Sequence, residues 1–352
     1  MRLMCLLCCL WLAACGPRGD DPAALAARAA GEGRLVVWSS TDRPIVGALL
    51  ADFQRLHPAL RVTYREMSAL PIHRLVEARM RDGGTMPDLV WTSAMDLQTK
   101  LVNDGHALRY ASPERAALPD WANWKNEAWG VTAEPIVMVY NRRLLPRALA
   151  PASHADLLRL LESGRPELRG RVATYDIAGS AVGYLYMSQD IAASRLAWPI
   201  VRALGSNGVR LFSTSEQIIA DVTSGRSVIG YNVLGSYAVA GMQRNPDLAV
   251  VLPSDYTLVA SRIAIITAKA PHPNAARLFL DYLLSRRGQA HLVAREMPSV
   301  RHDMAVPAGL AMPEQRQRAI RIGPAMLVIQ DTLTRKRLLA EWRAALRGST
   351  LP

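Results

Sequence analysis

The chain has 352 residues, half of them apolar, and a chain of this length usually folds as about two domains, each with its own buried core. Its 42 Lys and Arg residues against 30 Asp and Glu residues give a formal charge of +12. These cations are spread singly along the chain, as on a solvated surface, so the surplus gives only weak support for an anionic partner.

The amino-terminal residues predict export. All four cysteines lie within the first fifteen residues, and Arg2 precedes a short apolar stretch that ends in Leu12-Ala13-Ala14-Cys15. A basic start, an apolar segment too short to span a bilayer and small residues before a cysteine are typical of a bacterial lipoprotein signal. We expect residues 1–14 to be removed, Cys15 to carry the lipid and residues 15–33 to form a tether with one short helix. An ordinary secretory signal is the alternative, and export under either reading makes nucleic acid an unexpected partner.

Removal of the signal leaves one cysteine, so the sequence predicts neither an intrachain disulfide nor a thiolate zinc site. The seven histidines are scattered, without the i, i+4 spacing that places two metal ligands on one helix face. The sequence also lacks a P-loop, a G-x-S-x-G and a G-x-G-x-x-G motif. We therefore expect a protein without enzymatic activity, cofactor or metal site.

Strand and helix patterns alternate in the first third of the chain. Buried strands are predicted at 34–38, 60–65 and 88–91, and helices at 44–57, 73–81 and 94–103. This β-α-β-α-β-α order favours a parallel sheet whose ligand site lies beyond the carboxyl ends of the strands. Polar turns follow two of the strands there, where hydroxyls and helix amino-termini can bind an anion or merely cap helices. The candidates in these turns are Ser39, Ser40, Thr41, Arg43 and Ser93.

A second α/β block follows Pro135. Helices are predicted at 151–162, 180–194 and 215–224, and strands at 171–175, 209–212, 227–231 and 248–252. Two extended stretches, 129–140 and 255–268, are too long for ordinary strands and suggest two crossings between lobes. We expect a first lobe of 34–134 plus 263–352, with the helical carboxyl-terminal third (274–284 and 313–347) packed on it, and a second lobe of 135–262. Each lobe should hold a mostly parallel sheet flanked by helices.

The second block and the crossings contribute further candidates. A guanidinium fork matches the geometry of phosphate or carboxylate, a helix start offers backbone donors, and a tyrosine at a strand end can donate to an oxyanion. Surface exposure, a simple turn and core packing are the alternatives for these residue types, and Glu134 could pair with Arg262. The pattern Thr214-x-x-Gln217 predicts a capping box, so we leave that turn out of the site. The candidates are Glu134, Tyr175, Ser180, Tyr231, Asn232 and Arg262.

Five stretches resemble the ferric-iron and organophosphate branch of the substrate-binding proteins of ABC importers, the type 2 class whose lobes are linked by two strands. Within that branch the sequence is similar to proteins akin to the phosphoglycerate transport regulatory protein, which feed either a permease or a sensor kinase. The stretches are Leu35-Val36-Val37-Trp38-Ser39-Ser40-Thr41-Asp42, Asp88-Leu89-Val90-Trp91-Thr92-Ser93, Val137-Met138-Val139-Tyr140-Asn141, Val228-Ile229-Gly230-Tyr231-Asn232 and Pro298-Ser299-Val300-Arg301.

One departure from that branch concerns iron. Ferric-binding members hold the metal with adjacent tyrosines, because a hard trivalent cation favours phenolate oxygen. The matching region here runs from Tyr231 to Tyr237 without a Tyr-Tyr pair, which disfavours free iron as the ligand.

The resemblance and the residues together imply a monomeric solute receptor of the periplasm, lipid-anchored to the cell membrane or the outer membrane. Its two lobes would close over a small anion, an organophosphate or a carboxylate. The closed form would be recognised by the transmembrane subunits of an ABC importer or by the periplasmic domain of a sensor kinase. A ferric-iron receptor and, from another class, a lipid-anchored hydrolase are the alternatives.

Overall fold

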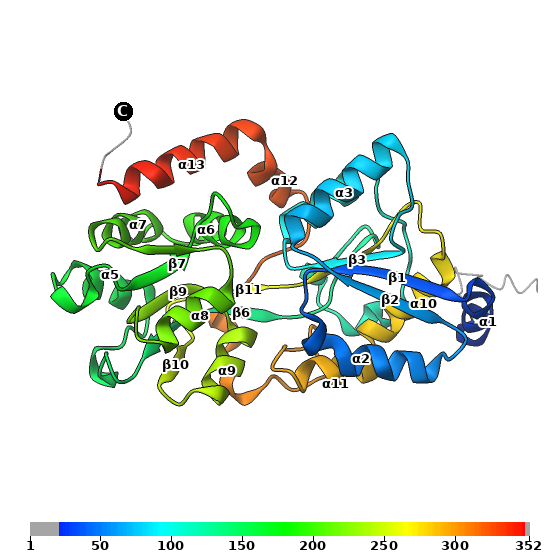
Figure 1. The fold of residues 1–352 in the computed structure, drawn as a ribbon, viewed down its shortest axis with the longest axis horizontal. Coiled ribbons are helices and arrows are strands. Elements are labelled where there is room, and N and C mark those ends of the chain that lie inside the picture. The colour runs from blue at the N-terminus through cyan, green and yellow to red at the C-terminus, as the bar shows by residue number, and fades with distance from the viewer. Residues whose placement is uncertain (1–20, 349–352) are drawn as a thin grey trace, which may run out of the picture.

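Two sheets, each flanked by helices, form two lobes that lie side by side along the longest axis of the molecule (Figure 1). The computed structural model describes residues 21–348. The predicted signal peptide, Cys15 and the first part of the predicted tether lie outside these residues. The two-lobed α/β architecture agrees with the sequence prediction. Both sheets mix parallel and antiparallel pairs, however, and are not mostly parallel.

The first lobe contains a six-stranded sheet of order β2-β1-β3-β12-β5-β4. Along β1, Leu35 and Val37 pack with one group of helices, and Trp38 packs with α3 and α4 on the other face, as the alternation of a strand requires. The strands are β1 (Arg34–Ser39), β2 (Arg61–Glu66), β3 (Leu89–Thr92), β4 (Asn123–Trp124), β5 (Ala128–Gly130) and β12 (Ile263–Ile266). The helices are α1 (Pro22–Glu32), α2 (Arg43–Leu56), α3 (Ala69–Asp82), α4 (Met95–Asn103), α10 (Pro273–Leu284) and α11 (Arg286–Val293).

The second lobe contains a seven-stranded sheet of order β13-β11-β6-β9-β7-β8, in which β10 also pairs with β6. Its strands are β6 (Glu134–Asn141), β7 (Val172–Tyr175), β8 (Arg210–Phe212), β9 (Ile229–Leu234), β10 (Leu248–Val251), β11 (Thr257–Ala260) and β13 (Gln317–Ala319). Its helices are α5 (His154–Glu162), α6 (Ala181–Ala193), α7 (Ala197–Ser206), α8 (Ser215–Thr223) and α9 (Gly235–Arg244). Short 3-10 helices lie at Pro113–Ala117, Asp120–Ala122, Arg147–Leu149, Pro166–Leu168, Ala308–Leu310 and Glu314–Arg316.

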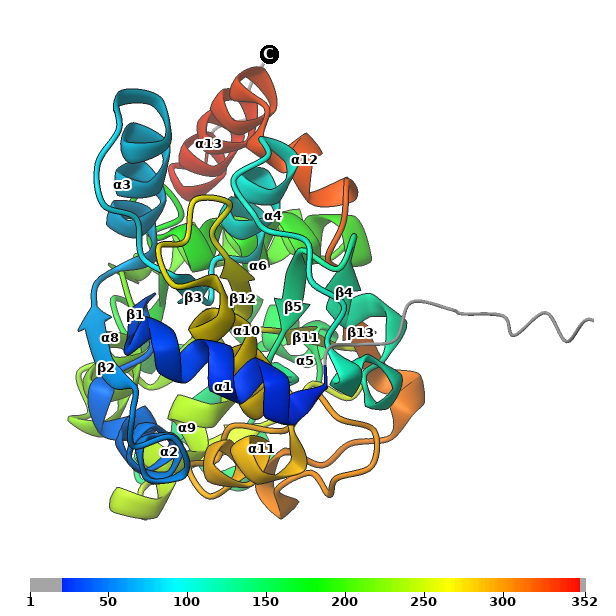
Figure 2. The same cartoon turned by 90° about the vertical axis from the view of Figure 1, so that its right-hand side faces the viewer.

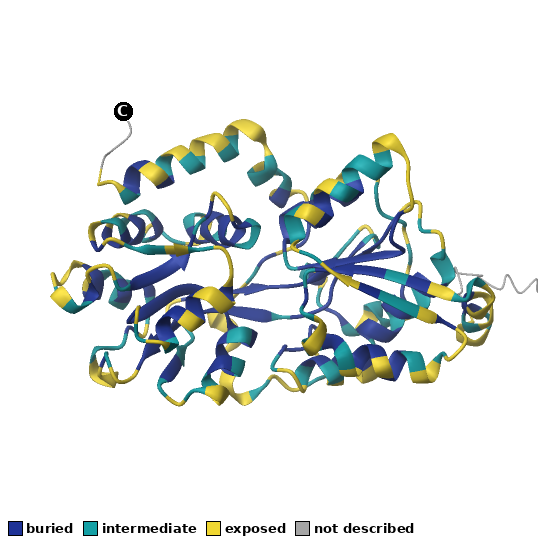
Figure 3. Cartoon of the chain, viewed as in Figure 1, coloured by how far each residue is buried: buried dark blue, intermediate teal, exposed yellow. Residues whose placement is uncertain are grey.

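The interior strands are buried, and the outer faces of the helices are exposed (Figure 3). Most residues of the central strands of both sheets are buried, whereas α2 and α13 each present an exposed outer face. No helix within residues 21–348 has the length and apolar character that a membrane span requires.

Two extended crossings join the lobes, as the sequence predicted. One crossing runs from β5 into β6, and the other returns from β11 into β12. They lie side by side, because the backbone N–H of Val131 donates to the Arg262 carbonyl at 2.8 Å and the N–H of Arg262 donates to Oγ1 of Thr132 at 2.9 Å. This pairing places Arg262 and Glu134 at the junction of the lobes.

The carboxyl-terminal segment does not pack on the first lobe alone, and here the sequence-based expectation was wrong. The segment first adds β13 to the second sheet, then places α12 (Ala325–Gln330) against α4 of the first lobe, and finally lays α13 (Thr332–Leu346) along α7 of the second lobe. Apolar side chains of α13, including Trp342 and Ala345, join a core with Val201 of α7. Figure 2 shows α12 and α13 on the opposite side of the molecule from α2 and α11, with α1 lying across α10.

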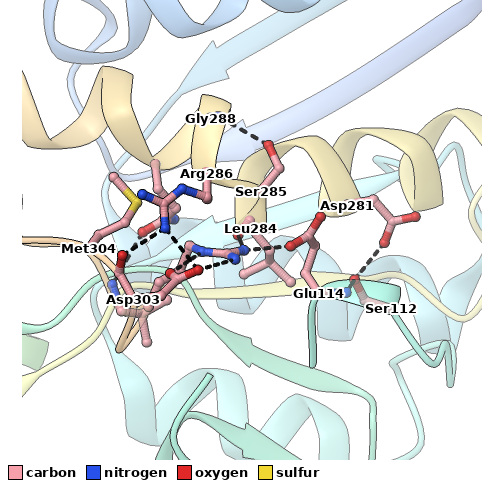
Figure 4. Close-up of polar contacts among 12 residues, drawn as sticks. Ser112, Glu114, Asp281, Leu284, Ser285, Arg286, Gly288, Asp303 and Met304 are labelled. Atoms are coloured by element: carbon pink, nitrogen blue, oxygen red, sulfur yellow. Dashed lines mark hydrogen bonds and ion pairs between the residues drawn. The ribbon is translucent and has the colours of Figure 1, made fainter. Parts of the chain in front are cut away.

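An ion-pair network fixes the loop that follows α11. The buried Arg301 donates to both carboxylate oxygens of Asp303, at 2.8 and 2.9 Å, and also pairs with Glu114. Figure 4 shows Glu114 and Asp303 on opposite sides of this network, with Arg286 beside Asp303. The same loop supports a crossing, because its Pro298 carbonyl accepts the N–H of Ala133 at 2.9 Å. The Pro298–Arg301 stretch thus has a structural role next to the hinge.

Candidate ligand-binding site

A cavity of about 430 Å³ lies between the two lobes. Its lining combines the polar turns of both lobes with the return crossing. The first lobe contributes Ser40, Asp42, residues 66–70 and Ser93; the second contributes Tyr175, residues 179–182, Tyr186, residues 213–216, Leu234 and Tyr237; the crossing contributes Arg262.

Arg262 is the cation of this lining, and it is 1% exposed. Its Nε donates to Oε1 of Glu134 at 3.0 Å, and its Nη1 donates to Oγ1 of Thr41 at 2.9 Å. The Tyr237 ring lies 5.4 Å from the guanidinium carbon. Burial opposes the charge, but the Glu134 carboxylate keeps the pKa of Arg262 above its ordinary value. Nη2 has no hydrogen-bond partner among residues 21–348, so a residue that borders the cavity keeps one buried donor group of a permanent cation unsatisfied.

Glu134 supports this guanidinium from behind the cavity. It is 1% exposed, and it accepts hydrogen bonds from the hydroxyl of Thr132 at 2.8 Å and from the hydroxyl of Ser236. With Arg262, these donors occupy both carboxylate oxygens. Of the two roles that the sequence left open for Glu134, pairing with Arg262 is therefore the one that the structure contains.

Three helices begin at the cavity wall. The first-turn residues of α3, α6 and α8 are all part of the lining. Ser180 caps α6 by accepting the N–H of Gly183, and Thr214 caps α8 by accepting the N–H of Gln217. The Ser68 side chain makes no capping bond at α3. Because the amino-terminal end of a helix carries partial positive charge and unpaired N–H groups, three such ends favour an anionic group in the cavity.

The end of β7 and the start of α6 are packed unusually closely. A Cβ atom on Gly183 would lie 2.4 Å from the Cβ of Tyr175, so a larger residue would push the helix start away from the strand. Tyr175 shares a 2.6 Å hydrogen bond with the hydroxyl of Ser215, which ties the starts of α6 and α8 to the same strand end. This packing fixes two helix starts next to each other on the cavity wall.

In the turn after β1, some side chains shape the turn and another borders the cavity, and the sequence could not show which does which. The hydroxyl of Ser39 donates to the Trp91 carbonyl at 2.7 Å and accepts the N–H of Thr41 at 3.0 Å, so Ser39 shapes the turn. Ser39 and Thr41 are fully buried and lie behind the lining. Ser40 lines the cavity, and its Oγ accepts the N–H of Ser93 at 3.2 Å.

One hydrogen bond crosses the cavity from lobe to lobe. The hydroxyl of Tyr237, on α9, donates to Oδ2 of Asp42 at 2.7 Å. Asp42 precedes α2 of the first lobe and belongs to the same polar turn as Ser40. The bond links the relative position of the lobes to a side chain that lies beside Arg262.

Carboxylates also belong to the lining. Asp42 and Glu66 come from the first lobe, and Glu216 comes from the first turn of α8. Glu66 accepts the backbone N–H of Arg43 at 2.8 Å. Within the described part of the chain none of the three carboxylates takes part in an ion pair. The cavity therefore offers acceptors as well as donors.

Six predicted site residues lie outside the lining. Ser39, Thr41 and Glu134 stand directly behind it, whereas Arg43, Tyr231 and Asn232 make contacts elsewhere, and for these three the structure departs from the prediction. Tyr231 and Asn232 point to the buried Asp190, to which they donate at 2.8 and 2.6 Å. Arg43 donates to the Tyr64 carbonyl at 3.3 Å. The sequence placed a strand end at Tyr231, but β9 runs on to Leu234, so Tyr231 and Asn232 lie within the strand.

The structure also brings in residues that the sequence analysis left out. The capping box at Thr214 is present, yet residues 213–216 line the cavity, because a capped helix start can still present its first turn to a ligand. Residues 66–70 line it as the carboxyl end of β2 and the start of α3, a position that the parallel-strand pattern could have indicated. Tyr186 has no comparable signal, because it lies inside a helix.

The chemistry of the tyrosines bears on metal binding. Burial raises the pKa of Tyr175, Tyr186 and Tyr237, which disfavours the phenolate form that a ferric ion requires. Within residues 21–348 no group of three His, Cys, Asp or Glu side chains is placed to hold a metal ion.

Comparison with known proteins gives a family and a fold. The family described as bacterial extracellular solute-binding protein matches residues 49–316. The substrate-binding protein of an ABC transporter from Agrobacterium tumefaciens is 38% identical, with a TM-score of 0.83 over 89% of this chain and 94% of that one. No curated protein matches the chain.

Two more distant structures share the fold. The periplasmic binding protein AfuA from Actinobacillus pleuropneumoniae, solved with fructose-6-phosphate, is 17% identical, with a TM-score of 0.74 over 90% of this chain and 99% of that one. Iron-bound HitA from Pseudomonas aeruginosa is 17% identical, with a TM-score of 0.70 over 89% of this chain and 99% of that one. Related folds thus hold a sugar phosphate in one case and iron in the other.

Proposed function

This chain belongs to the bacterial extracellular solute-binding protein family, and we propose that its solute is a small organic anion, an organophosphate or a carboxylate, bound between the lobes. The family and the Agrobacterium tumefaciens relative make it a solute-binding protein of the ABC-transporter type with an extracytoplasmic location. Such proteins interact with the membrane subunits of the transporter.

The unsatisfied Nη2 of Arg262 is the observation that carries the proposal. A buried guanidinium normally satisfies its donors, because an unpaired buried donor costs about 1–3 kcal/mol. Here Nε and Nη1 are satisfied by Glu134 and Thr41, whereas Nη2 has no partner among residues 21–348. An oxyanion in the cavity would supply the missing acceptor.

The surrounding groups suit the same ligand. The amino-terminal ends of α3, α6 and α8 add partial positive charge, and the hydroxyls of Ser40, Ser93 and Ser180 can donate or accept. Glu134, Ser39 and Thr41 would act as positioning residues behind these groups. The cavity of about 430 Å³ has room for a small organic phosphate or a dicarboxylate.

Capture would couple ligand contacts to the position of the lobes. The lining comes from both lobes, so a ligand that touches both stabilises the arrangement in which they face each other. We propose that the ligand-bound arrangement is recognised by the transmembrane subunits of an importer. The similarity to the phosphoglycerate transport regulatory protein suggests a sensor kinase as the other partner. We also propose that Cys15 anchors the protein to a membrane through a lipid. Acyl-labelling of the exported protein, and loss of the label in Cys15→Ser, would test that anchor.

A thermal-shift screen tests the ligand class. Ligand that binds only the native state raises the melting temperature, so we would screen the purified protein with phosphoglycerates, sugar phosphates, phosphonates, di- and tricarboxylates and ferric citrate. A shift with one class of organic anion, reduced in Ser40→Ala and in Ser93→Ala, supports the proposal. A shift with ferric ion and none of the organic anions overturns it.

A further inference from the structure

The charged groups of the cavity do not match a simple anion. The lining holds three carboxylates, those of Asp42, Glu66 and Glu216, and one guanidinium, that of Arg262. Glu134 already neutralises that guanidinium at 3.0 Å. The formal charge around the cavity is therefore negative, in a protein whose overall charge is +12. An anion alone would be repelled by these carboxylates.

The chain pairs carboxylates with arginine in other places. Asp221, for example, binds both Arg210 and Arg226. The three cavity carboxylates instead have neutral donors or none. Asp42 accepts the Tyr237 hydroxyl, Glu66 accepts a backbone N–H, and Glu216 accepts no side-chain hydrogen bond from residues 21–348. Their charges remain available to a ligand.

The positions of the carboxylates define a second half of the site. Asp42 and Glu66 meet at the start of α2, because Glu66 accepts the N–H of the residue that follows Asp42. Glu216 lies on the opposite lobe, at the start of α8. The Tyr237 hydroxyl donates to Asp42, the Tyr237 ring lies under Arg262, and Glu216 borders the same cavity, so the two halves of the site adjoin each other. A closing movement would bring carboxylates from both lobes toward the same ligand.

We propose that the ligand is a small zwitterion, in which an ammonium or similar cationic group accompanies the anionic group. The anionic group binds Nη2 of Arg262 and the helix amino-termini, and the cationic group lies among Asp42, Glu66 and Glu216. This inference rests on the proposed function, since the anionic half occupies the site proposed there. It deepens that function by assigning the carboxylates to a cationic group of the solute.

Matched pairs of small anions test the inference by isothermal titration calorimetry. O-phosphoethanolamine and ethyl phosphate differ by one ammonium group, and so do β-alanine and propionate. We expect the ammonium-bearing member of at least one pair to bind about tenfold tighter or better, the gain of one hydrogen bond between charged groups. Glycerol 1-phosphate serves as the competing neutral, hydroxylated probe, and MgCl2 added to ethyl phosphate tests whether a metal ion replaces the ammonium.

Variants of the cavity carboxylates test whether these side chains cause the preference for an ammonium group. Glu216→Gln and Glu66→Gln change exposed side chains, so we expect them to fold, and each should reduce the ammonium preference several-fold while leaving the ammonium-free member unchanged or slightly tighter. The matched control is Glu314→Gln, which changes an exposed glutamate away from the cavity. It should change the affinity for neither member of a pair.

The outcomes separate the two proposals. Equal affinity within both pairs, or tighter binding of glycerol 1-phosphate or of ethyl phosphate with magnesium, overturns the zwitterion and leaves the anion receptor standing. Failure of every one of these probes to bind, together with a negative thermal-shift screen, removes the anion receptor and the zwitterion with it.

Discussion

The Tyr237 hydroxyl on α9 of the second lobe donates a 2.7 Å hydrogen bond to Oδ2 of Asp42 on the first lobe. The same phenol ring lies 5.4 Å from the guanidinium carbon of Arg262. One side chain therefore contacts the opposite lobe and the cation of the cavity at once. Any ligand that changes the surroundings of Arg262 also acts on a contact between the lobes.

Tyr237→Phe should weaken ligand binding without unfolding the protein. The ring under Arg262 is kept, but the hydrogen bond to Asp42 is lost. This loss should destabilise the arrangement in which the two lobes face each other by about 0.5–1.5 kcal/mol. That loss corresponds to about a two- to tenfold weaker affinity for the ligand found in the thermal-shift screen, measured by calorimetry.

Tyr282→Phe provides the control for that experiment. Tyr282 donates to Oδ2 of Asp52 at 2.9 Å, within the first lobe and away from the cavity lining. Its loss should lower the melting temperature and leave the dissociation constant unchanged. An affinity loss in Tyr282→Phe as large as in Tyr237→Phe would show that general destabilisation, and not the contact between the lobes, was responsible.

Arg262→Met should destabilise the protein more than the same substitution of an exposed arginine would. The substitution leaves the buried Glu134 carboxylate without its cation, a change that typically costs about 3–5 kcal/mol. The double variant Arg262→Met/Glu134→Gln should recover much of this loss in urea unfolding, because the amide oxygen can accept one of the hydroxyls of Thr132 and Ser236 and the amide NH2 can donate to the other. Ligand binding should remain absent in the recovered protein. Binding at the native level there would show that Arg262 supports the fold alone.

The sequence identified the elements that position the site better than the side chains that form it. The apolar alternation in β1 and the polar turn after it follow from local patterns, and so do Ser40, Ser93 and Ser180 at strand ends and helix starts. Arg262 could be proposed because it lies on a long extended stretch.

The remaining residues depend on information that is not local. Tyr237 reaches the cavity only because α9 and the Asp42 turn face each other across the lobes. Tyr231 projects to Asp190 because of the face it occupies on β9, where the pairing with β6 is interrupted and Asn232 has a φ of 62°. Such an irregularity changes which side chains face the cavity, and a local sequence pattern does not encode it.

Ferric iron should produce no visible charge-transfer band with the purified protein. A tyrosinate–iron colour requires deprotonated phenols, and burial raises the pKa of Tyr175, Tyr186 and Tyr237. The measurement is an absorption spectrum during titration with ferric nitrilotriacetate. A coloured complex that disappears in Tyr237→Phe would contradict this expectation and favour an iron receptor.

Asp96 makes stability depend on pH at the contact between α4 and the carboxyl-terminal segment. This carboxyl is 1% exposed; its Oδ2 accepts from Nε2 of Gln330 on α12, and its Oδ1 has no partner among residues 21–348. Burial raises the pKa of Asp96 from 3.8 to about 6, against the lowering effect of its hydrogen-bond donors. The native protein therefore keeps a proton that the unfolded chain has released between these two values, so the contribution of Asp96 to stability is largest at low pH and falls as the pH rises through that window.

Asp96→Asn removes this titration while keeping an acceptor for Gln330. We compare the free energy of unfolding of the variant with that of the parent protein at two pH values. The difference, variant minus parent, should be larger at pH 7.5 than at pH 4 by about 2–3 kcal/mol, so that the variant gains stability relative to the parent as the pH rises. Urea unfolding at the two pH values measures it. Equal differences at both pH values would mean that Asp96 keeps an ordinary pKa in the folded protein. Asp96 lies in the first lobe, and the chain runs from Gln330 directly into α13 on the second, so this titration takes place where the carboxyl-terminal segment bridges the lobes.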